Sequence, residues 1–255
     1  MNTITFPTER ILDYSVCTLK PAALAPPVSR WLDAADGKAR HIACVNPHSV
    51  EVARGDAAFK LALQRADMLI PDGVGIVYAS RFNGGDITQR VTGFDLFQLA
   101  SELVEAREGR MMFLGSSEDV LATIRKNMAR DYPGITVKTH SPPYKPVFSD
   151  EDNAVMHRAV NAFGPDVLWV GMTAPKQEKW VEANRAFLNT RVIGSIGAVF
   201  DFYAGRIQRP GKVWRNLGLE WLPRLVGEPR RLWRRMGISA PLFVGAVLAD
   251  RFRRK

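Results

Sequence analysis

Short apolar runs alternate with longer amphipathic stretches between about residue 40 and residue 200. Apolar runs of three to five residues predict strands, and the stretches between them repeat apolar side chains at helical spacing. The predicted strands are 41–45, 68–70, 111–114, 135–139, 167–170 and 192–196. Because these runs are nearly continuous, they favour a mostly parallel sheet with helices on both faces, a Rossmann-like α/β fold.

Helices are predicted between these strands. They cover 49–65, a segment from residue 74, 94–106, and segments that begin near residues 116, 150 and 175. Ser116 and Ser117 precede Glu118 and Asp119, which is typical of a helix N-terminus. Pro175 suits the first turn of a helix.

The last fifty residues have a different pattern, in which large apolar side chains recur every three or four positions at Trp214, Leu217, Trp221 and Leu225. This spacing predicts an amphipathic helix, and a second helix is predicted from Pro229. We therefore divide the chain into an α/β domain over residues 1–205 and a helical, basic C-terminal appendage over residues 206–255.

Charge sets the appendage apart. It holds thirteen Lys or Arg and three Asp or Glu, a net +10, whereas residues 1–205 carry a net −1. Such a segment predicts an anionic partner, which is a membrane surface, a nucleic acid or a phosphorylated substrate. The apolar run 238–249 is shorter than the roughly 20 residues that span a membrane, so it either lies in an interface or docks on the body.

Two cysteines make no disulfide framework, and the N-terminus has no signal-peptide core. These features predict a protein of a reducing compartment. The oligomeric state stays open at this point, a homo-oligomer included.

Polar residues follow the predicted strands: Asn46, Asp72, Arg90, Gln177 and Asp201. Ligands of parallel sheets bind beyond the carboxyl ends of the strands, so these side chains are expected to share one edge. Each also has an ordinary structural interpretation. Pro-Asp-Gly is common turn chemistry, Asp201 suits a loop or a helix cap, Gln177 suits a first turn, and Arg90 suits a surface ion pair.

Several kinds of site are not predicted. The four histidines lack metal-ligand spacing, and neither a GxSxG elbow, a P-loop nor a complete GxGxxG occurs. Asp150-Glu-Asp152 is expected to begin a helix rather than hold a metal. We therefore expect no metal and no cofactor.

Six segments carry a resemblance to a known family. They are ADMLIPDGVGIVYAS, QRVTGFDL, MFLGSS, DVLWVGMTAPKQEKW, GAVFDFYAGRIQRP and GLEWLPRLVGEPRRLWRR. In this order they resemble the WecG/TagA/CpsF family of bacterial glycosyltransferases, from about residue 44 to residue 235.

The resemblance implies an inverting, metal-independent transfer of a sugar from a UDP-sugar to a polyprenyl-diphosphate-linked saccharide. The pathway would be exopolysaccharide or other cell-surface polysaccharide synthesis, at the inner face of the plasma membrane. Asp72 matches the catalytic base of the family, and the matching active-site polar residues are Asn46, Arg90 and Gln177. The appendage arginines that match those reaching the membrane and completing the site are Arg224, Arg231 and Arg234. Asp201, in the matching GAVFDFYAG segment, is a further expected substrate contact.

One segment departs from the family pattern. The teichoic-acid branch has TPNPE where this chain has Cys44-Val-Asn-Pro-His48. A hydroxyl is missing and a histidine replaces an acid, so the donor sugar is left open between a hexose and N-acetylmannosamine.

Two other functions compete with sugar transfer. The basic appendage also suits a nucleic-acid-binding protein, although no nucleic-acid-binding motif accompanies the charge. The sheet also suits a dinucleotide-dependent oxidoreductase, which the missing glycine-rich fingerprint disfavours.

Overall fold

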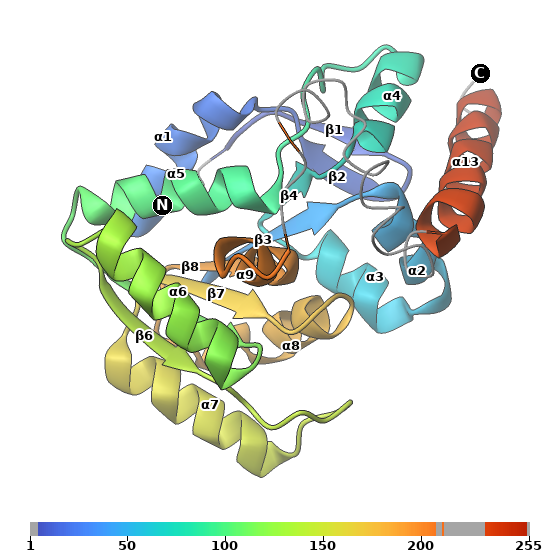
Figure 1. The fold of residues 1–255 in the computed structure, drawn as a ribbon. Coiled ribbons are helices and arrows are strands. Elements are labelled where there is room, and N and C mark those ends of the chain that lie inside the picture. Colours follow the sequence, from blue (N-terminus) through green and yellow to red (C-terminus); the bar gives the residue numbers. More distant parts are fainter. Residues whose placement is uncertain (1–4, 208–210, 212–232, 254–255) are drawn as a thin grey trace.

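A computed structural model describes residues 5–207, 211 and 233–253 of the chain. Its centre is a six-stranded, entirely parallel sheet in the order β4-β3-β8-β7-β5-β6 (Figure 1). The strands are β3 (Arg40–Val45), β4 (Met68–Pro71), β5 (Arg110–Gly115), β6 (Thr136–His140), β7 (Val167–Gly171) and β8 (Val192–Ser195). The predicted Rossmann-like α/β fold is confirmed, with strand limits that differ from the prediction by a few residues at most.

Helices cover both faces of the sheet (Figure 1). One face packs against α1 (Ala25–Asp33), α5 (Gly93–Glu105), α6 (Glu118–Asp131) and α9 (Gly197–Tyr203). The other face packs against α2 (Pro47–Gly55), α3 (Ala57–Gln64), α7 (Asp150–Phe163) and α8 (Lys176–Asn184), followed by the short turn η2 (Arg185–Phe187). Successive strand residues face opposite layers, so continuous apolar runs fill both layers at once.

Phe97 on α5 lies at the centre of the first layer. It is fully buried, and its ring centroid lies 4.8 Å from that of Tyr203 on α9, 5.9 Å from that of Trp169 on β7 and 6.2 Å from that of Phe113 on β5. One aromatic side chain therefore connects two helices to the middle of the sheet.

The single helix predicted over 49–65 is wrong. The structure has two helices there, α2 and α3, separated by Asp56. The Asp56 side chain accepts a hydrogen bond from the Phe59 amide at 2.9 Å and so begins a new helix. Apolar spacing continues through the break, and for this reason the pattern did not reveal it.

The first forty residues had no predicted elements. They form an antiparallel hairpin of β1 (Thr8–Ile11) and β2 (Tyr14–Cys17), then the turn η1 (Pro21–Leu24) and α1. The hairpin lies beside β4, and it packs with α4 (Val74–Asn83). It therefore covers the sheet edge that ends in Pro71.

The basic appendage is helical over residues 234–253. This stretch comprises η3 (Arg234–Ser239) and α13 (Ala240–Arg253), and α13 buries Phe243 and Val247 among side chains of α2 and α4. The run 238–249 thus docks on the body, one of the two expected arrangements. The amphipathic segment 214–225 lies outside the described residues, and the domain boundary after residue 205 stays a prediction. Within the described ranges no helix is both long and apolar enough to cross a membrane.

We predict that Phe97→Ala lowers the free energy of unfolding by about 3–5 kcal/mol, because it removes a buried aromatic side chain and leaves a cavity. Urea unfolding of the purified protein measures this. Tyr144→Ala is the control, since Tyr144 is fully exposed and its loss should change the free energy by less than about 0.5 kcal/mol. Equal effects of both changes would contradict the role given to Phe97.

Candidate active site

Two turns at the carboxyl edge of the sheet pack directly on each other. Asn46 and Pro47 follow β3, and the segment from Asp72 follows β4, whose pairing continues through a hydrogen bond from the Asp72 amide to the Val45 carbonyl at 2.8 Å. Gly73 has φ +116°, and a side chain there would begin 3.8 Å from the Asn46 Cβ; at Gly75 it would collide with Pro47. The glycines of Pro-Asp-Gly-Val-Gly therefore allow Asp72 and Asn46 to be neighbours.

Asn46 has a structural task in this arrangement. Its side-chain oxygen accepts a hydrogen bond from the Ser49 amide at 2.9 Å, and the Ser49 hydroxyl accepts a hydrogen bond from the Asn46 backbone amide at 2.8 Å. This reciprocal capping box begins α2. The side-chain NH2 group has no part in the capping box and is the chemical group that could serve a ligand.

Arg90 comes to the same edge from the segment before α5. The Val91 amide donates to the Pro71 carbonyl at 2.8 Å, which places Arg90 beside the end of β4 and the start of the Asp72 turn. Thr92 and Asp95 then form a second reciprocal capping box that begins α5, with the Asp95 carboxylate 2.8 Å from the Thr92 hydroxyl. Within the QRVTGFDL motif, Arg90 is therefore followed directly by the Val91–Pro71 hydrogen bond and the Thr92–Asp95 capping box, which together fix its backbone position.

Gln177 and Asp201 belong to the adjoining part of the edge. Gln177 is buried at the start of α8, and its side-chain oxygen accepts from the Gly197 amide, at the start of α9, at 3.2 Å. Asp201 lies inside the short helix α9, so the expectation of a loop or cap position is wrong. Its carboxylate has no hydrogen-bond or ion-pair partner within the described ranges, whereas its backbone carbonyl accepts from the Arg206 and Ile207 amides.

Three carboxyl groups from different elements act on the Cys44 thiol of β3. Burial raises the pKa of the Cys44 thiol well above its ordinary value, and the carboxylates of Asp72, Glu178 and Asp95 raise it further. The three carboxylates come from the end of β4, the start of α8 and the start of α5. The sequence alone does not single out Glu178 and Asp95, because acidic residues in first turns usually have only a capping role.

Among the described residues, the appendage is hydrogen-bonded to this edge at His48. The His48 ring, in the first turn of α2, is hydrogen-bonded through Nδ1 to the buried Ser239 hydroxyl at 2.9 Å. The histidine that departs from the family pattern therefore joins the body to the end of η3. Arg224 and Arg231 lie outside the described residues, and of Arg234 the structure describes the backbone alone, so their expected roles stay predictions.

Other candidate chemistry is accounted for by the fold. Asp152 caps α7 with Ser149 and pairs with Lys145 at 2.8 Å, which confirms the helix start expected at Asp150-Glu-Asp152. In the part of the chain that the structure describes, no three His, Cys, Asp or Glu residues are grouped to hold a metal ion. Metal independence of the reaction stays a prediction.

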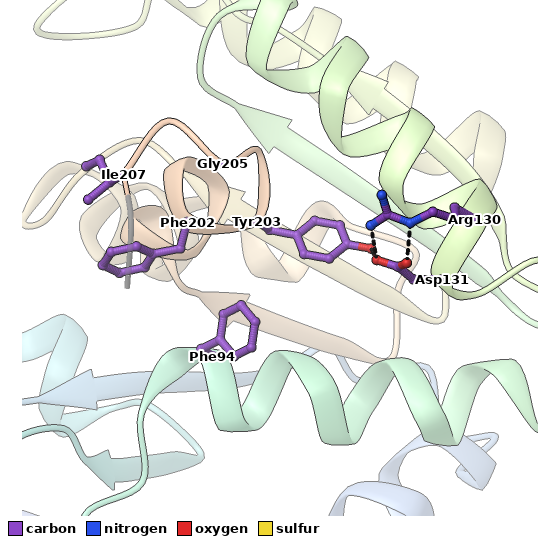
Figure 2. A pocket seen from close by; sticks show the side chains of 7 residues that line it. All are labelled: Phe94, Arg130, Asp131, Phe202, Tyr203, Gly205 and Ile207. Atoms are coloured by element: carbon purple, nitrogen blue, oxygen red, sulfur yellow. Dashed lines mark hydrogen bonds and ion pairs between the residues drawn. The ribbon is translucent and has the colours of Figure 1, made fainter. Parts of the chain in front are cut away.

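A hollow of about 510 Å³ lies beside α5, α6 and α9 (Figure 2). Phe94 and Phe202 lie toward one end, and Arg130 and Asp131 lie at the other. Arg130 pairs with Asp131 at 2.7 Å, and the Tyr203 hydroxyl donates to Asp131 at 2.9 Å. The polar groups of this hollow already bind one another, so we assign it no ligand.

Comparison with known proteins adds a family to this geometry. Residues 9–255 match the glycosyl transferase WecG/TagA/CpsF family. The chain belongs to this glycosyltransferase family. Membership decides for an enzyme over the competing nucleic-acid-binding and oxidoreductase interpretations.

Curated relatives agree with this assignment. The chain is 30% identical to the N-acetylglucosaminyldiphosphoundecaprenol N-acetyl-beta-D-mannosaminyltransferase of Bacillus spizizenii strain W23, over 83% of this chain and 79% of the relative. It is 27% identical to the protein of the same name from Bacillus subtilis strain 168, over 84% and 81% of the two chains. It is 25% identical to the protein of the same name from Staphylococcus aureus strain MW2, over 80% of this chain and 77% of the relative.

We predict that Asn46→Ala lowers the free energy of unfolding by about 1 kcal/mol through loss of the cap, whereas Asn46→Ser, which keeps an acceptor oxygen, changes it by less than half of that. Urea unfolding measures both. If Asn46 also binds substrate through its amide group, then both variants lose sugar transfer. Full activity of the serine variant would limit Asn46 to capping.

Proposed function

We propose that this glycosyltransferase moves a sugar from a UDP-sugar to a polyprenyl-diphosphate-linked saccharide, with inversion, in the synthesis of an exopolysaccharide or another cell-surface polysaccharide. The observation that carries the proposal is the similarity, over about four fifths of the chain, to proteins named as transferases onto a diphosphoundecaprenol-linked sugar. The shared edge of Asn46, Asp72 and Arg90 supports it.

Asp72 is the proposed base. A hydroxyl of the acceptor saccharide attacks the anomeric carbon, the bond from that carbon to the UDP oxygen breaks, and the proton of the hydroxyl passes to Asp72. Asp72 suits this step because it lies at the edge where the carboxyl ends of the parallel strands leave room for a ligand.

The leaving UDP carries negative charge that the protein has to stabilise. Arg90 is the proposed cation of the body, and the proposed cations of the appendage are Arg224, Arg231 and Arg234. A guanidinium group binds two phosphate oxygens at once, which suits a diphosphate leaving group in the absence of a metal. Asn46, Gln177 and Asp201 are the proposed polar contacts to the sugar and to the acceptor.

The donor sugar is a hexose or N-acetylmannosamine. The relatives' names describe mannosaminyl transfer, but the His48 position differs from that branch, and its ring contacts Ser239 of the appendage. A donor screen with UDP-glucose, UDP-glucuronic acid, UDP-galactose and the two UDP-N-acetylhexosamines distinguishes these donors.

We also propose that the protein attaches peripherally to the cytoplasmic face of the plasma membrane through its appendage. The outward side of α13 exposes several apolar residues, with Val244 55% and Phe252 73% exposed. The opposite side holds the helix on the body through Phe243 and Val247. Basic residues in the same segment add roughly 1 kcal/mol each at an anionic surface.

We predict that Asp72→Asn lowers kcat by about 10²- to 10⁴-fold, the range of a positioned general base. The measurement is transfer of radiolabelled sugar from the best donor of the screen to a polyprenyl-diphosphate-linked N-acetylglucosamine. Asp150→Asn, which removes an exposed carboxylate on α7, is the control and should keep full activity. Equal rates for Asp72→Asn and the wild type would refute the assignment of the base.

We further predict that the double change Val244→Asp and Phe252→Asp weakens binding to anionic phospholipid vesicles at least tenfold, because each buried apolar side chain contributes about 1.5–3 kcal/mol. Vesicle sedimentation measures this. Tyr144→Asp places a charge at a more exposed site, in the segment between β6 and α7, which lies away from α13 in Figure 1, and should bind as the wild type does. Unchanged binding of the double variant would rule out α13 as the contact.

A further inference from the structure

Glu178 is an acidic side chain whose position the proposed mechanism does not use. It lies in the first turn of α8 and is only 2% exposed. One carboxylate oxygen accepts from Gln177 Nε2 at 2.8 Å, whereas the other is buried and has no hydrogen-bond partner among the described residues. Leaving a carboxylate oxygen buried without a donor costs free energy, so its presence at this edge calls for a reason.

The contact with Glu178 fixes the direction of the Gln177 side chain. A carboxamide can turn its oxygen or its NH2 group toward a neighbour. Because the NH2 group donates to Glu178, the oxygen of Gln177 is directed at the Gly197 amide, 3.2 Å away. Glu178 thereby holds, through Gln177, the first turn of the helix that carries Asp201.

Glu178 and Asp72 both act electrostatically on the Cys44 thiol of β3. The groups that share this region are the Cys44 thiol from β3, Asp72 from the end of β4 and Asp95 from α5. The cations of the neighbouring helices are engaged elsewhere: Lys179 pairs with Asp56 at 2.8 Å, and Arg65 pairs with Glu182 at 3.1 Å. Within the described ranges no cation lies within ion-pair distance of Glu178.

We propose that Glu178 is a positioning residue of the sugar-transfer site, which orients Gln177 and whose charge state sets how strongly the site binds an anionic donor. The inference rests on the proposed UDP-sugar donor. A neutral Glu178 leaves the edge with less negative charge when the diphosphate arrives. An ionised Glu178 repels the diphosphate and weakens its binding.

Glu178 changes its charge state near neutral pH. Burial raises the pKa of Glu178 to about 7, and the hydrogen bond from Gln177 opposes that shift. Below pH 7 the carboxyl group is mostly protonated, and above pH 7 it is mostly charged. Binding of a diphosphate should therefore weaken as the pH rises through 7.

The test compares UDP binding to the wild type and to Glu178→Gln by calorimetry between pH 6 and pH 8. The glutamine keeps an oxygen for the Gln177 hydrogen bond and does not titrate. We expect the ratio of the wild-type Kd to the variant Kd to rise about three- to tenfold from pH 6 to pH 8. Ionisation of the UDP phosphate itself cancels in this ratio.

Glu182→Gln is the matched control, because it removes a carboxylate one turn further along the same helix, where Glu182 pairs with Arg65. Its Kd ratio should not depend on pH. If the Kd ratio for Glu178→Gln does not change with pH and both proteins bind UDP well, the role given to Glu178 is wrong, whereas the proposed donor class stands. If UDP binds to neither protein at any pH, the proposed donor class falls, and this inference falls with it.

Discussion

The close contact between the turn after β3 and the turn after β4 is the constraint on which the rest of the site depends. Two adjacent parallel strands end side by side. Their following segments approach closely because Gly75 leaves room for Pro47 and because Gly73 adopts a φ of +116° that few other residues tolerate. Asn46, on one side of this contact, caps the start of α2. On the other side, the Pro71 carbonyl accepts a hydrogen bond from the Val91 amide, next to Arg90. A side chain at Gly75 would therefore disturb the contact between the two turns, the start of α2 and the position of Arg90.

A second constraint is electrostatic. The edge collects carboxylates from β4, α5 and α8 around one thiol, although the substrate of such an enzyme is itself anionic. Residues 1–205 carry a net −1 and do not offset this charge, whereas residues 206–255 carry a net +10. In the proposed mechanism the body supplies the base and the positioning groups, and Arg90 and the basic appendage supply the cations that bind the diphosphate.

The sequence predicted the sheet and the edge, because continuous apolar strands and polar residues after them leave a clear local pattern. It did not predict the break at Asp56, where a capping carboxylate interrupts helical spacing, or the N-terminal hairpin, whose strands are only four residues long. Glu178 was missed for a different reason. Its burial depends on where α8 meets α3, β7 and β8, and the sequence offers only a weak signal for it, the buried Val181 three residues later on the same helix face.

The described residues on either side of 208–232 attach to the body beside this edge. After α9, the Arg206 and Ile207 amides donate to the Asp201 carbonyl, and Ser239 is hydrogen-bonded to His48 in the first turn after Asn46. Both attachment points flank the candidate site, since α9 follows β8, α2 follows β3, and these two strands are neighbours in the sheet. Docking of Phe243 and Val247 holds the second attachment point in place. The described residues that come before and after Arg224 and Arg231 in the sequence therefore both lie beside the candidate site.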